Sequence, residues 1–348
     1  MIELSKYWDI NRILPYNRCF NLINGERSIG KSYTTQKFIV KRAIERGQEF
    51  VYIVRTQDEK KKGIFESAFQ KVLQNEFGNH NFKFNSEEMF HEYDNEAGEK
   101  EIVRLGYCFA LTECVKIKKR SFPNVKYLMF DEYMLEANQS ISYVNGWNEP
   151  DLFLSMYHTI DRENDKVVCF LLGNNTSFYN PYHMHKAFNI PQIKKGELWY
   201  NENVLFQWAT CTEELKEDKA ASKFLRMIEP TKYGQYAAKG DYIDDNTEFI
   251  GKKDSSATHY FTFDYNDNTF GVWLSRNEGV IYISEKYDPS CKIHFAFSLK
   301  DHKENTLLTK DKHNTLLQWL ARNFKLGNVK FETMEIKKKT EGAILTLL

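Results

Sequence analysis

The sequence feature that says most about the fold of this chain is a glycine-rich loop between a strand pattern and a helix pattern. The loop reads NGERSIGKS at 24–32, which matches G-x-x-x-x-G-K-[ST], and the β-prone run CFNLI at 19–23 precedes it. Residues 31–46 carry an apolar stripe at helical spacing and stop at Gly47. The apolar run FVYIV at 50–54 is typical of a strand in a parallel sheet. Together these patterns predict a right-handed βαβ unit.

Residues 25–32, which we call the phosphate loop, are predicted to bind the phosphates of ATP. Gly25 and Gly30 let the backbone approach an anion closely, and the N-terminus of the following helix adds partial positive charge. Lys31 is expected to reach the β- and γ-phosphates, and Ser32 to ligate Mg²⁺. The alternative is a glycine-rich turn with an exposed lysine, which the flanking patterns disfavour. The residues predicted to contact ATP are Gly25, Arg27, Ser28, Ile29, Gly30, Lys31, Ser32 and Tyr33.

A second motif is a pair of carboxylates directly after a strand pattern. The run VKYLMF at 125–130 leads into Asp131 and Glu132. Asp131 is predicted to hold Mg²⁺, because ligands of open α/β sheets bind at the carboxyl ends of the strands. Glu132 is predicted to polarise a water for attack on the γ-phosphate, which favours hydrolysis over phosphoryl transfer. The alternative is that the pair caps the next helix.

Two polar residues flank the next strand pattern, KVVCFLL at 166–172. Asn174 is predicted to lie beside the γ-phosphate as a sensor, although asparagine also ends many strands as a turn former. Arg162 is either an arginine finger for the site of a neighbouring subunit or the partner of a nearby carboxylate. Arg27 is a second cationic candidate. The predicted catalytic residues are Lys31, Glu132, Arg162 and Asn174.

Composition restricts the cellular context and the partners of the chain. Its 348 residues carry 48 basic and 48 acidic side chains, so overall charge does not argue for a nucleic-acid partner. No apolar run approaches the ~20 residues needed to cross a bilayer, and the N-terminal MIELSKYWDI lacks a signal-peptide layout. The six cysteines form no C-x-x-C pair and are expected to be reduced. These features predict an intracellular protein with no membrane partner.

Three regions are expected along the chain. Residues 1–205 are predicted to form an α/β nucleotide-binding domain with a mainly parallel sheet, and 206–250 a helical linker. Residues 251–348 are predicted to form a small α+β domain, because HYFTFDY, TFGVWLS and VIYISEK are separated by turn residues at hairpin spacing. Asp264 and Asp267 are expected at a strand edge and a turn. Further elements are expected at 57–77 (helix), 314–324 (helix) and 329–335 (strand).

Four segments together resemble the DNA-packaging ATPases (encapsidation proteins) of small phi29-like phages. NGERSIGKSY is similar to the family's G-x-R-x-I-G-K-S-Y loop, including the arginine at Arg27. SFPNVKYLMFDEY resembles its Y-P-N-V…V-F-D-E-F strand. KVVCFLLGNN resembles its strand ending in asparagine, with Arg162 at the finger position upstream. TFGVWLSRNEGVIYISEKYDPS resembles its C-terminal hairpin, so the match follows the same order over most of the chain.

This resemblance implies a ring-forming, ASCE-type P-loop ATPase that uses ATP and Mg²⁺ to pump double-stranded DNA into a preformed procapsid. It further implies a homo-oligomeric ring, expected to be a pentamer, that docks on the portal, in some members through a packaging RNA. The protein would act in the host cytoplasm, transiently at the portal vertex. The C-terminal domain would resemble an RNase H-like nuclease that has lost its metal-binding acids.

Contacts with DNA must come from local cations. The basic run Lys116, Lys118, Lys119 and Arg120 precedes the strand that ends at Asp131, and is predicted to form a loop facing the pore. Such a patch would contact phosphates without reading bases. A solvated loop without a role in DNA binding is the open alternative. The run at 60–62 is expected to be a solvated helix face.

Two rival functions share these residues. A related P-loop DNA helicase would use the same site and would separate strands on forked DNA. A nucleotide-gated ring scaffold would bind ATP without turnover, which the presence of Glu132 argues against.

Overall fold

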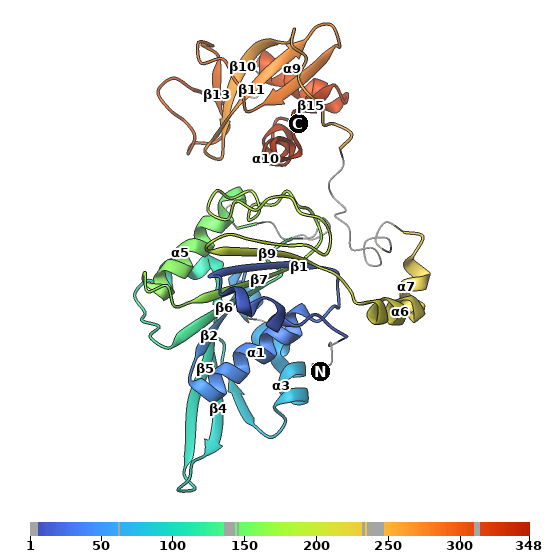
Figure 1. Cartoon of the computed structure of the whole chain (residues 1–348). Coiled ribbons are helices and arrows are strands. Elements are labelled where there is room, and N and C mark those ends of the chain that lie inside the picture. Colours follow the sequence, from blue (N-terminus) through green and yellow to red (C-terminus); the bar gives the residue numbers. More distant parts are fainter. Residues whose placement is uncertain are drawn as a thin grey trace. The chain divides into compact units, whose positions relative to one another are not determined.

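The chain divides into two compact units, residues 1–243 and 244–348, each with its own sheet (Figure 1). The structure is a computed structural model. The residues that it describes are 6–61, 63–135, 143–144, 146–231, 234, 247–309 and 314–348.

The first unit is built on a nine-stranded sheet in the order β3-β4-β5-β2-β6-β7-β1-β9-β8. The strands from β5 to β9 in this order pair in parallel, and the strands beyond them at both edges pair antiparallel. This confirms the mainly parallel sheet. The strands are β1 (Phe20–Gly25), β2 (Glu49–Val54), β3 (Asn81–Phe84), β4 (Glu88–Asp94), β5 (Lys100–Ala110), β6 (Val125–Asp131), β7 (Val168–Asn174), β8 (Leu198–Tyr200) and β9 (Val204–Ala209).

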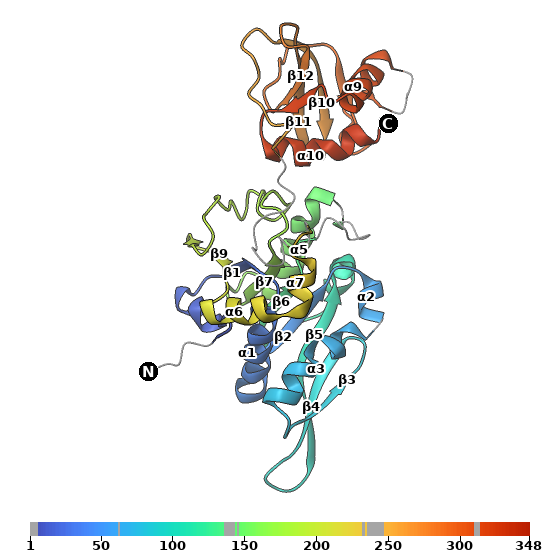
Figure 2. The same cartoon turned by 90° about the vertical axis from the view of Figure 1, so that its right-hand side faces the viewer.

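Helices cover both faces of this sheet (Figures 1 and 2). On one face, α1 (Lys31–Arg46) and α3 (Ile64–Glu76) pack on the strands, and the ring of Phe69 in α3 stacks on Phe50 of β2. On the other face lies α5 (Glu149–Asp161), whose Phe153 stacks on Phe130 of β6. Burial on both faces explains why the central strands are continuous apolar runs.

Short helices complete the first unit. Gly63 interrupts the helix expected over 57–77, which is therefore two helices rather than one. The boundary expected at 205 falls inside β9, a strand of the nine-stranded sheet. The short helices are η1 (Ile10–Arg12), η2 (Leu14–Tyr16), α2 (Gln57–Lys61), η3 (Leu111–Glu113), α4 (Cys114–Ile117), η4 (Gly146–Asn148), α6 (Glu213–Ala221) and α7 (Lys223–Ile228).

In its described residues, the second unit consists of a six-stranded sheet and two helices, in agreement with the expected α+β class. Its strand order is β14-β13-β10-β11-β12-β15, with antiparallel pairing of β10 with β11 and of β11 with β12. The expected strand over 329–335 ends early, because Thr333 caps the N-terminus of a helix that begins at Met334. The elements are β10 (Thr258–Tyr265), β11 (Asn268–Ser275), β12 (Val280–Ser284), β13 (His294–Ala296), β14 (Leu307–Leu308), α9 (Thr315–Lys325), β15 (Val329–Phe331) and α10 (Met334–Leu345).

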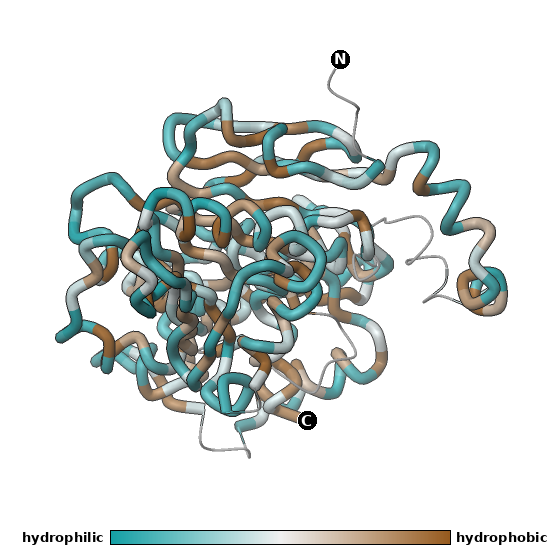
Figure 3. The backbone as a smooth tube through the Cα atoms, turned by 90° about the horizontal axis from the view of Figure 1, so that it is seen from below, coloured by the Kyte–Doolittle hydropathy of each residue, from teal (hydrophilic) through white to brown (hydrophobic). Residues whose placement is uncertain are grey.

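Hydrophobic residues occur as short stretches along both units (Figure 3). Brown hydrophobic segments are interrupted by teal hydrophilic ones throughout the tube. Among the helices that the structure describes, none has the length and apolar character needed to cross a membrane.

Candidate nucleotide-binding site

The phosphate loop lies between the end of β1 and the start of α1. Gly30, with φ of 97°, is the N-cap residue of α1, so the helix N-terminus directly follows the loop. A Cβ atom added at Gly25 would lie 2.7 Å from Ile29 Cδ1 and 2.9 Å from the carbonyl oxygen of Ala209. Only glycine therefore fits where β1 passes into the loop.

Lys31 points back onto the phosphate loop. Its Nζ donates hydrogen bonds to the carbonyl oxygens of Gly25 and Glu26, at 3.0 and 2.8 Å. Burial lowers the pKa of Lys31 to about 8, although the charge of Asp131 opposes this effect. The side chain thus stays protonated near neutral pH, and its positive charge lies where phosphates are predicted to bind.

Ser32 and Asp131 are brought together by the order of the strands. β7 lies between β1 and β6, so the loops after β1 and β6 meet at the same edge of the sheet. The Ser32 hydroxyl donates to Asp131 Oδ1 at 3.0 Å. Burial raises the pKa of Asp131 to about 6; the charge of Glu132 acts in the same direction, and the hydrogen bond from Ser32 opposes it.

The chemistry of these donors fits Mg²⁺. A hydroxyl and a carboxylate are oxygen ligands, and Mg²⁺ is usually held by one or two carboxylates together with waters and substrate phosphates. Within the described ranges, no group of three or more His, Cys, Asp or Glu residues is placed to hold a metal ion by protein ligands alone. Ser32 and Asp131 would therefore hold Mg²⁺ jointly with the phosphates of a nucleotide.

Glu132 has an exposed side chain on a backbone that is held firmly in place. Its φ is 57°, which is uncommon for a residue with a side chain. The guanidinium of Arg55 donates to the carbonyl oxygens of Glu132 and Tyr133, at 3.2 and 2.8 Å. Arg55 also forms a buried ion pair with Glu149, with Nε 3.0 Å from Oε2. The sequence patterns do not point to Arg55, apart from its position directly after the apolar run of β2.

Asn174 ends β7, between the strands that lead to the phosphate loop and to Asp131. The preceding Gly173 allows close packing, because a Cβ there would lie 2.9 Å from Tyr133 Cε1 and 3.1 Å from Asn24 Oδ1. The Tyr133 hydroxyl donates to Asn24 Oδ1 at 2.6 Å and lies 2.8 Å from His183 Nε2. Burial lowers the pKa of His183 to about 3, so this ring is neutral. Tyr133 thus connects the segment after β6 to the end of β1.

A cleft of about 1310 Å³ extends from this edge of the sheet along α1 as far as Arg46 and onto α3. It is lined by Ser28, Ile29, Gly30, Lys31, Ser32 and Tyr33, together with Asp131, Glu132 and Asn174. Tyr7 also lines it, and the backbone N–H of Trp8 donates to the carbonyl of Ile29 at 2.8 Å. Gly25 and Arg27, predicted to contact ATP, are not among the lining residues. The cleft therefore collects the predicted metal ligands, base and sensor in one place.

Arg162 lies far from this cleft within the same chain. It follows the last residue of α5, whose 13 residues span about 20 Å from the end near Arg55 and Glu132. Its Nη2 donates to the backbone carbonyl of Arg120 at 3.0 Å. Arg162 is therefore out of reach of the cleft of its own chain.

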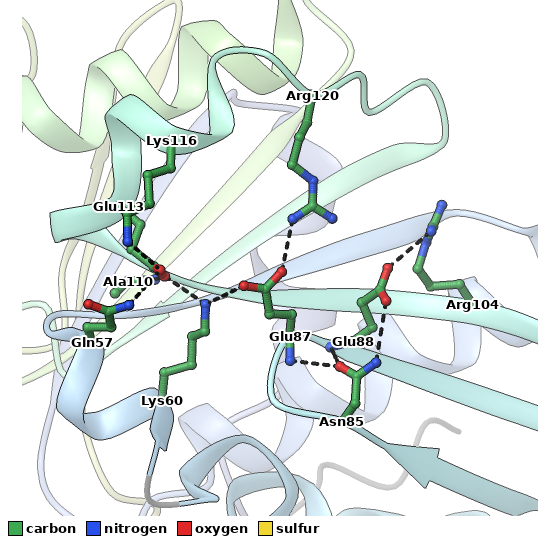
Figure 4. Close-up of polar contacts among 10 residues, drawn as sticks. All are labelled: Gln57, Lys60, Asn85, Glu87, Glu88, Arg104, Ala110, Glu113, Lys116 and Arg120. Atoms are coloured by element: carbon green, nitrogen blue, oxygen red, sulfur yellow. Dashed lines mark hydrogen bonds and ion pairs between the residues drawn. The ribbon is translucent and has the colours of Figure 1, made fainter.

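Two cations of the basic run at 116–120 have carboxylate partners, Arg120 and Lys116, although Lys116 is exposed (Figure 4). The Arg120 guanidinium lies 3.0 Å from Glu87 Oε2 and 5.1 Å from the centre of the Phe109 ring. Lys116 Nζ is 3.7 Å from Glu113 Oε1. Lys118 and Lys119 are exposed. These two lysines are thus better placed than Arg120 to meet a partner.

Lys60 corrects one expectation, because it is not on a solvated helix face. Its side chain is only 6% exposed, and its Nζ lies 2.8 Å from both Glu87 Oε1 and Glu113 Oε2 (Figure 4). The lysine therefore joins α2 to the segments before β4 and after β5. Lys61 is exposed as expected, and Lys62 lies outside the described residues.

Comparison with known proteins gives matches over most of the chain. A family model described as "Podovirus DNA encapsidation protein (Gp16)" matches residues 2–343. The DNA packaging protein of Bacillus phage phi29 is 29% identical over 338 residues, covering 97% of this chain and 96% of that protein. The DNA packaging protein of Bacillus phage B103 is 28% identical over 321 residues, covering 92% and 94%.

Solved structures agree with these sequence matches. The bacteriophage phi29 viral genome packaging motor assembly aligns with a TM-score of 0.73 and 27% identity, covering 99% of this chain and 100% of that chain. The N-terminal domain of the DNA packaging ATPase from phi29 aligns with a TM-score of 0.50 and 27% identity, covering 60% of this chain and 99% of that chain.

The fold and the site define a mixed α/β protein of the class of phage DNA-packaging motors. The chain belongs to the family of podovirus DNA encapsidation proteins, which confirms the resemblance found in its sequence motifs.

Proposed function

We propose that this protein is an ATP-hydrolysing motor that translocates double-stranded viral DNA into a preformed procapsid. The observation that carries this proposal is the cleft in which Lys31, Ser32 and the Asp131–Glu132 pair meet. Its relatives are described as DNA packaging proteins, and a homologous structure comes from a genome packaging motor.

Each residue of the cleft has a chemical role in this proposal. Lys31 and the N-terminus of α1 meet the negative charge of the phosphates, and Mg²⁺ bound by Ser32 and Asp131 would neutralise charge on their oxygens. Glu132 accepts a proton from the attacking water, while Arg55 holds the backbone on which Glu132 sits. Asn174 would orient that water or the γ-phosphate.

The position of Arg162 supports the proposed assembly into a ring. Because α5 separates Arg162 from its own cleft by about 20 Å, an arginine finger at this position must act on the cleft of a neighbouring subunit. The placement of β7 between β1 and β6 supports an ASCE-type P-loop ATPase. A pentameric ring at the portal vertex in the host cytoplasm, in contact with the portal and a packaging RNA, is part of the same proposal.

The DNA contacts in this proposal are made by Lys118 and Lys119 of the loop before β6. Both lysines are exposed, whereas Arg120 is held by Glu87 and by aromatic rings. Contacts from lysines to phosphates are independent of base sequence, as a translocating motor requires.

The second unit is proposed to be an RNase H-like domain without nuclease activity. Its buried Asp264 is occupied by protein groups, since Thr269 Oγ1 donates to it at 2.6 Å and Lys303 Nζ lies 3.3 Å away. A two-metal nuclease site needs several carboxylates free to converge on the ions.

The test is ATP turnover by the purified chain with and without double-stranded DNA and procapsids. We expect turnover to rise when both are present, and Lys31→Ala to abolish nucleotide binding in a calorimetric titration because it removes the charge that meets the phosphates. Binding without turnover would indicate a scaffold, and strand displacement on forked DNA a helicase. Unchanged ATP affinity of Lys31→Ala would contradict the assigned site.

A further inference from the structure

The second residue of the phosphate loop, Glu26, places a carboxylate close to Lys31, the lysine proposed to meet the phosphates of a nucleotide. The side chain is 3% exposed, so water screens its charge poorly. Its backbone carbonyl accepts the hydrogen bond from Lys31, which places the residue directly beside that lysine. An unneutralised carboxylate here would oppose the binding of phosphates.

Three groups from one region of the chain surround this carboxylate. The Cys211 thiol donates to Glu26 Oε2 at 2.8 Å, Lys219 Nζ lies 3.3 Å from the same oxygen, and Lys195 Nζ lies 3.4 Å from Oε1. Burial alone would raise the pKa of Glu26, but the Cys211 hydrogen bond and the two lysines outweigh it and lower that pKa. Glu26 is therefore ionised at neutral pH and balanced by cations from outside the loop.

Lys219 also contacts the backbone of the phosphate loop. Besides Glu26, it donates to the backbone carbonyl of Arg27 at 2.8 Å and to Cys211 Sγ at 3.1 Å, and its side chain is only 15% exposed. Lys219 thus balances the charge of Glu26 and also holds the backbone of the phosphate loop in place.

Lys219 belongs to α6, the helix that follows the last parallel strand of the sheet (yellow in Figure 2). Thr212 caps this helix through Leu215 N, and its hydroxyl also donates to the carbonyl of Lys6 at 2.7 Å. Leu215 is buried. The position of α6 on the sheet therefore determines whether Lys219 reaches the phosphate loop.

We infer that Lys219 is a positioning residue for nucleotide binding. It neutralises Glu26 together with Lys195, and it holds the backbone of the phosphate loop in place. Nucleotide affinity therefore depends on the position of α6 relative to this loop. This inference rests on the proposed function, because it requires that the cleft binds a nucleotide. It assigns to α6, in the segment between the nine-stranded sheet and the second unit, control over the phosphate site.

The test is a double-mutant cycle on ATP affinity in the full-length chain. We expect Lys219→Met to weaken ATP binding about tenfold or more, since Lys195 would then have to balance the buried charge of Glu26 near the phosphate loop without Lys219. Glu26→Gln should bind ATP at least as tightly as the wild type, and the double variant should recover affinity to within about threefold of it. Lys219→Arg, which keeps the charge, should stay close to the wild type.

Lys216→Met provides the matched control, because Lys216 lies on the same helix and pairs with Glu213 at the surface, at 2.7 Å. It should bind ATP like the wild type. A double variant as weak as Lys219→Met would overturn the inference, because the lysine would then act by shape and not by charge. Equal affinity of Lys219→Met and wild type would overturn it as well.

Failure of the proposed function gives a different result. If the wild type bound no ATP, the proposed function would fall, and this inference with it. If the wild type bound ATP and Lys31→Ala did not, the nucleotide site would stand, and the cycle at positions 26 and 219 would decide the inference alone.

Discussion

The two units of the molecule treat a carboxylate on a sheet strand in opposite ways. In the first unit, Asp131 accepts hydrogen bonds from the Ser32 hydroxyl and the N–H of Glu132 and faces an open cleft. In the second unit, Asp264 is met by the hydroxyl of Thr269 and by His294 and Lys303, whose nitrogens lie 3.0 and 3.3 Å from it.

The pKa values of Asp131 and Asp264 are shifted in opposite directions, in line with their different partners. Burial raises the pKa of Asp131 to about 6, whereas for Asp264 the effect of burial is outweighed by Thr269, His294 and Lys303, which lower the pKa. A carboxylate with a raised pKa lacks a sufficient cation, and a bound metal ion would supply one. Protein groups thus already balance the charge of Asp264, whereas the proposed Mg²⁺ would balance that of Asp131.

The test with the largest expected effect asks whether the cleft of the first unit contains all its catalytic residues within one chain. Arg162→Ala should lower turnover by about 10³–10⁵ while leaving ATP binding intact, as expected of a finger supplied by a neighbour. Mixing Arg162→Ala with Glu132→Gln subunits should partly restore turnover, because some interfaces then pair an intact Glu132 with an intact Arg162.

Co-assembly of the two variants must be demonstrated first, by co-purification of differently tagged subunits. If mixed rings form and turnover does not return, Arg162 is not supplied in trans. The hydrogen bond from Arg162 to Arg120 would then be its main role.

A second test concerns Glu132, the carboxylate that follows Asp131. Glu132→Gln should keep ATP affinity and lose about 10²–10⁴ in turnover, since an amide cannot accept the proton of the attacking water. The side chain is exposed, so little stability should be lost. Calorimetric titration and a phosphate-release assay measure the two quantities, and normal turnover would remove Glu132 from the role of base.

A third test uses pH to probe the cation in the cleft. Because Lys31 has its pKa lowered to about 8, binding of phosphates above that pH requires uptake of a proton. The apparent Kd for ATP should therefore rise above about pH 8, by up to about tenfold per pH unit. Lys31→Arg keeps its charge in this range and should show a flat profile. A wild-type affinity that is constant up to pH 10 would contradict the assignment.

The same shift has a consequence for folding in the absence of nucleotide. The folded-state pKa lies below the unfolded value of 10.5, so the unfolded chain binds more protons between about pH 8 and 10.5. The contribution of Lys31 to the free energy of unfolding should therefore rise with pH over this window.

The smallest expected effect lies in the second unit. Asp264→Asn should cost about 1–3 kcal/mol of stability, because Lys303 and His294 lose a charged partner, yet ATP turnover should be unchanged. Urea unfolding and the phosphate-release assay check the two expectations. Asp267→Asn is the matched control, since Asp267 meets Lys300 at an exposed position. A large loss of turnover in Asp264→Asn would make the second unit part of the chemistry.

Much of the first unit could be predicted from its sequence because the signals are local. Helix α1 begins and ends as expected, since glycines lie at both of its ends. Asp131 and Glu132 follow an apolar run that becomes β6. The phosphate loop, the metal ligands and the candidate base are all close in sequence to such patterns.

Contacts between distant residues could not be predicted in the same way. Arg55 and Glu149 form a buried ion pair across 94 residues, and neither lies in a recognisable motif. Lys60 belongs to a lysine run that resembles a solvated helix face, but its partners Glu87 and Glu113 come from other elements. A charge on a helix is buried only when the tertiary fold supplies its counter-charges, and a local pattern does not contain that information.

The packing at Gly173 has a consequence for sequence divergence within the family. A side chain at this position would clash with the ring of Tyr133, whose hydroxyl donates a hydrogen bond to Asn24. Residues that compete for one volume change together. We therefore expect relatives with a larger residue at position 173 to carry a smaller one at 133 and a different partner at 24. Substitutions at these three positions should therefore occur together, although positions 24 and 173 are 149 apart in the sequence.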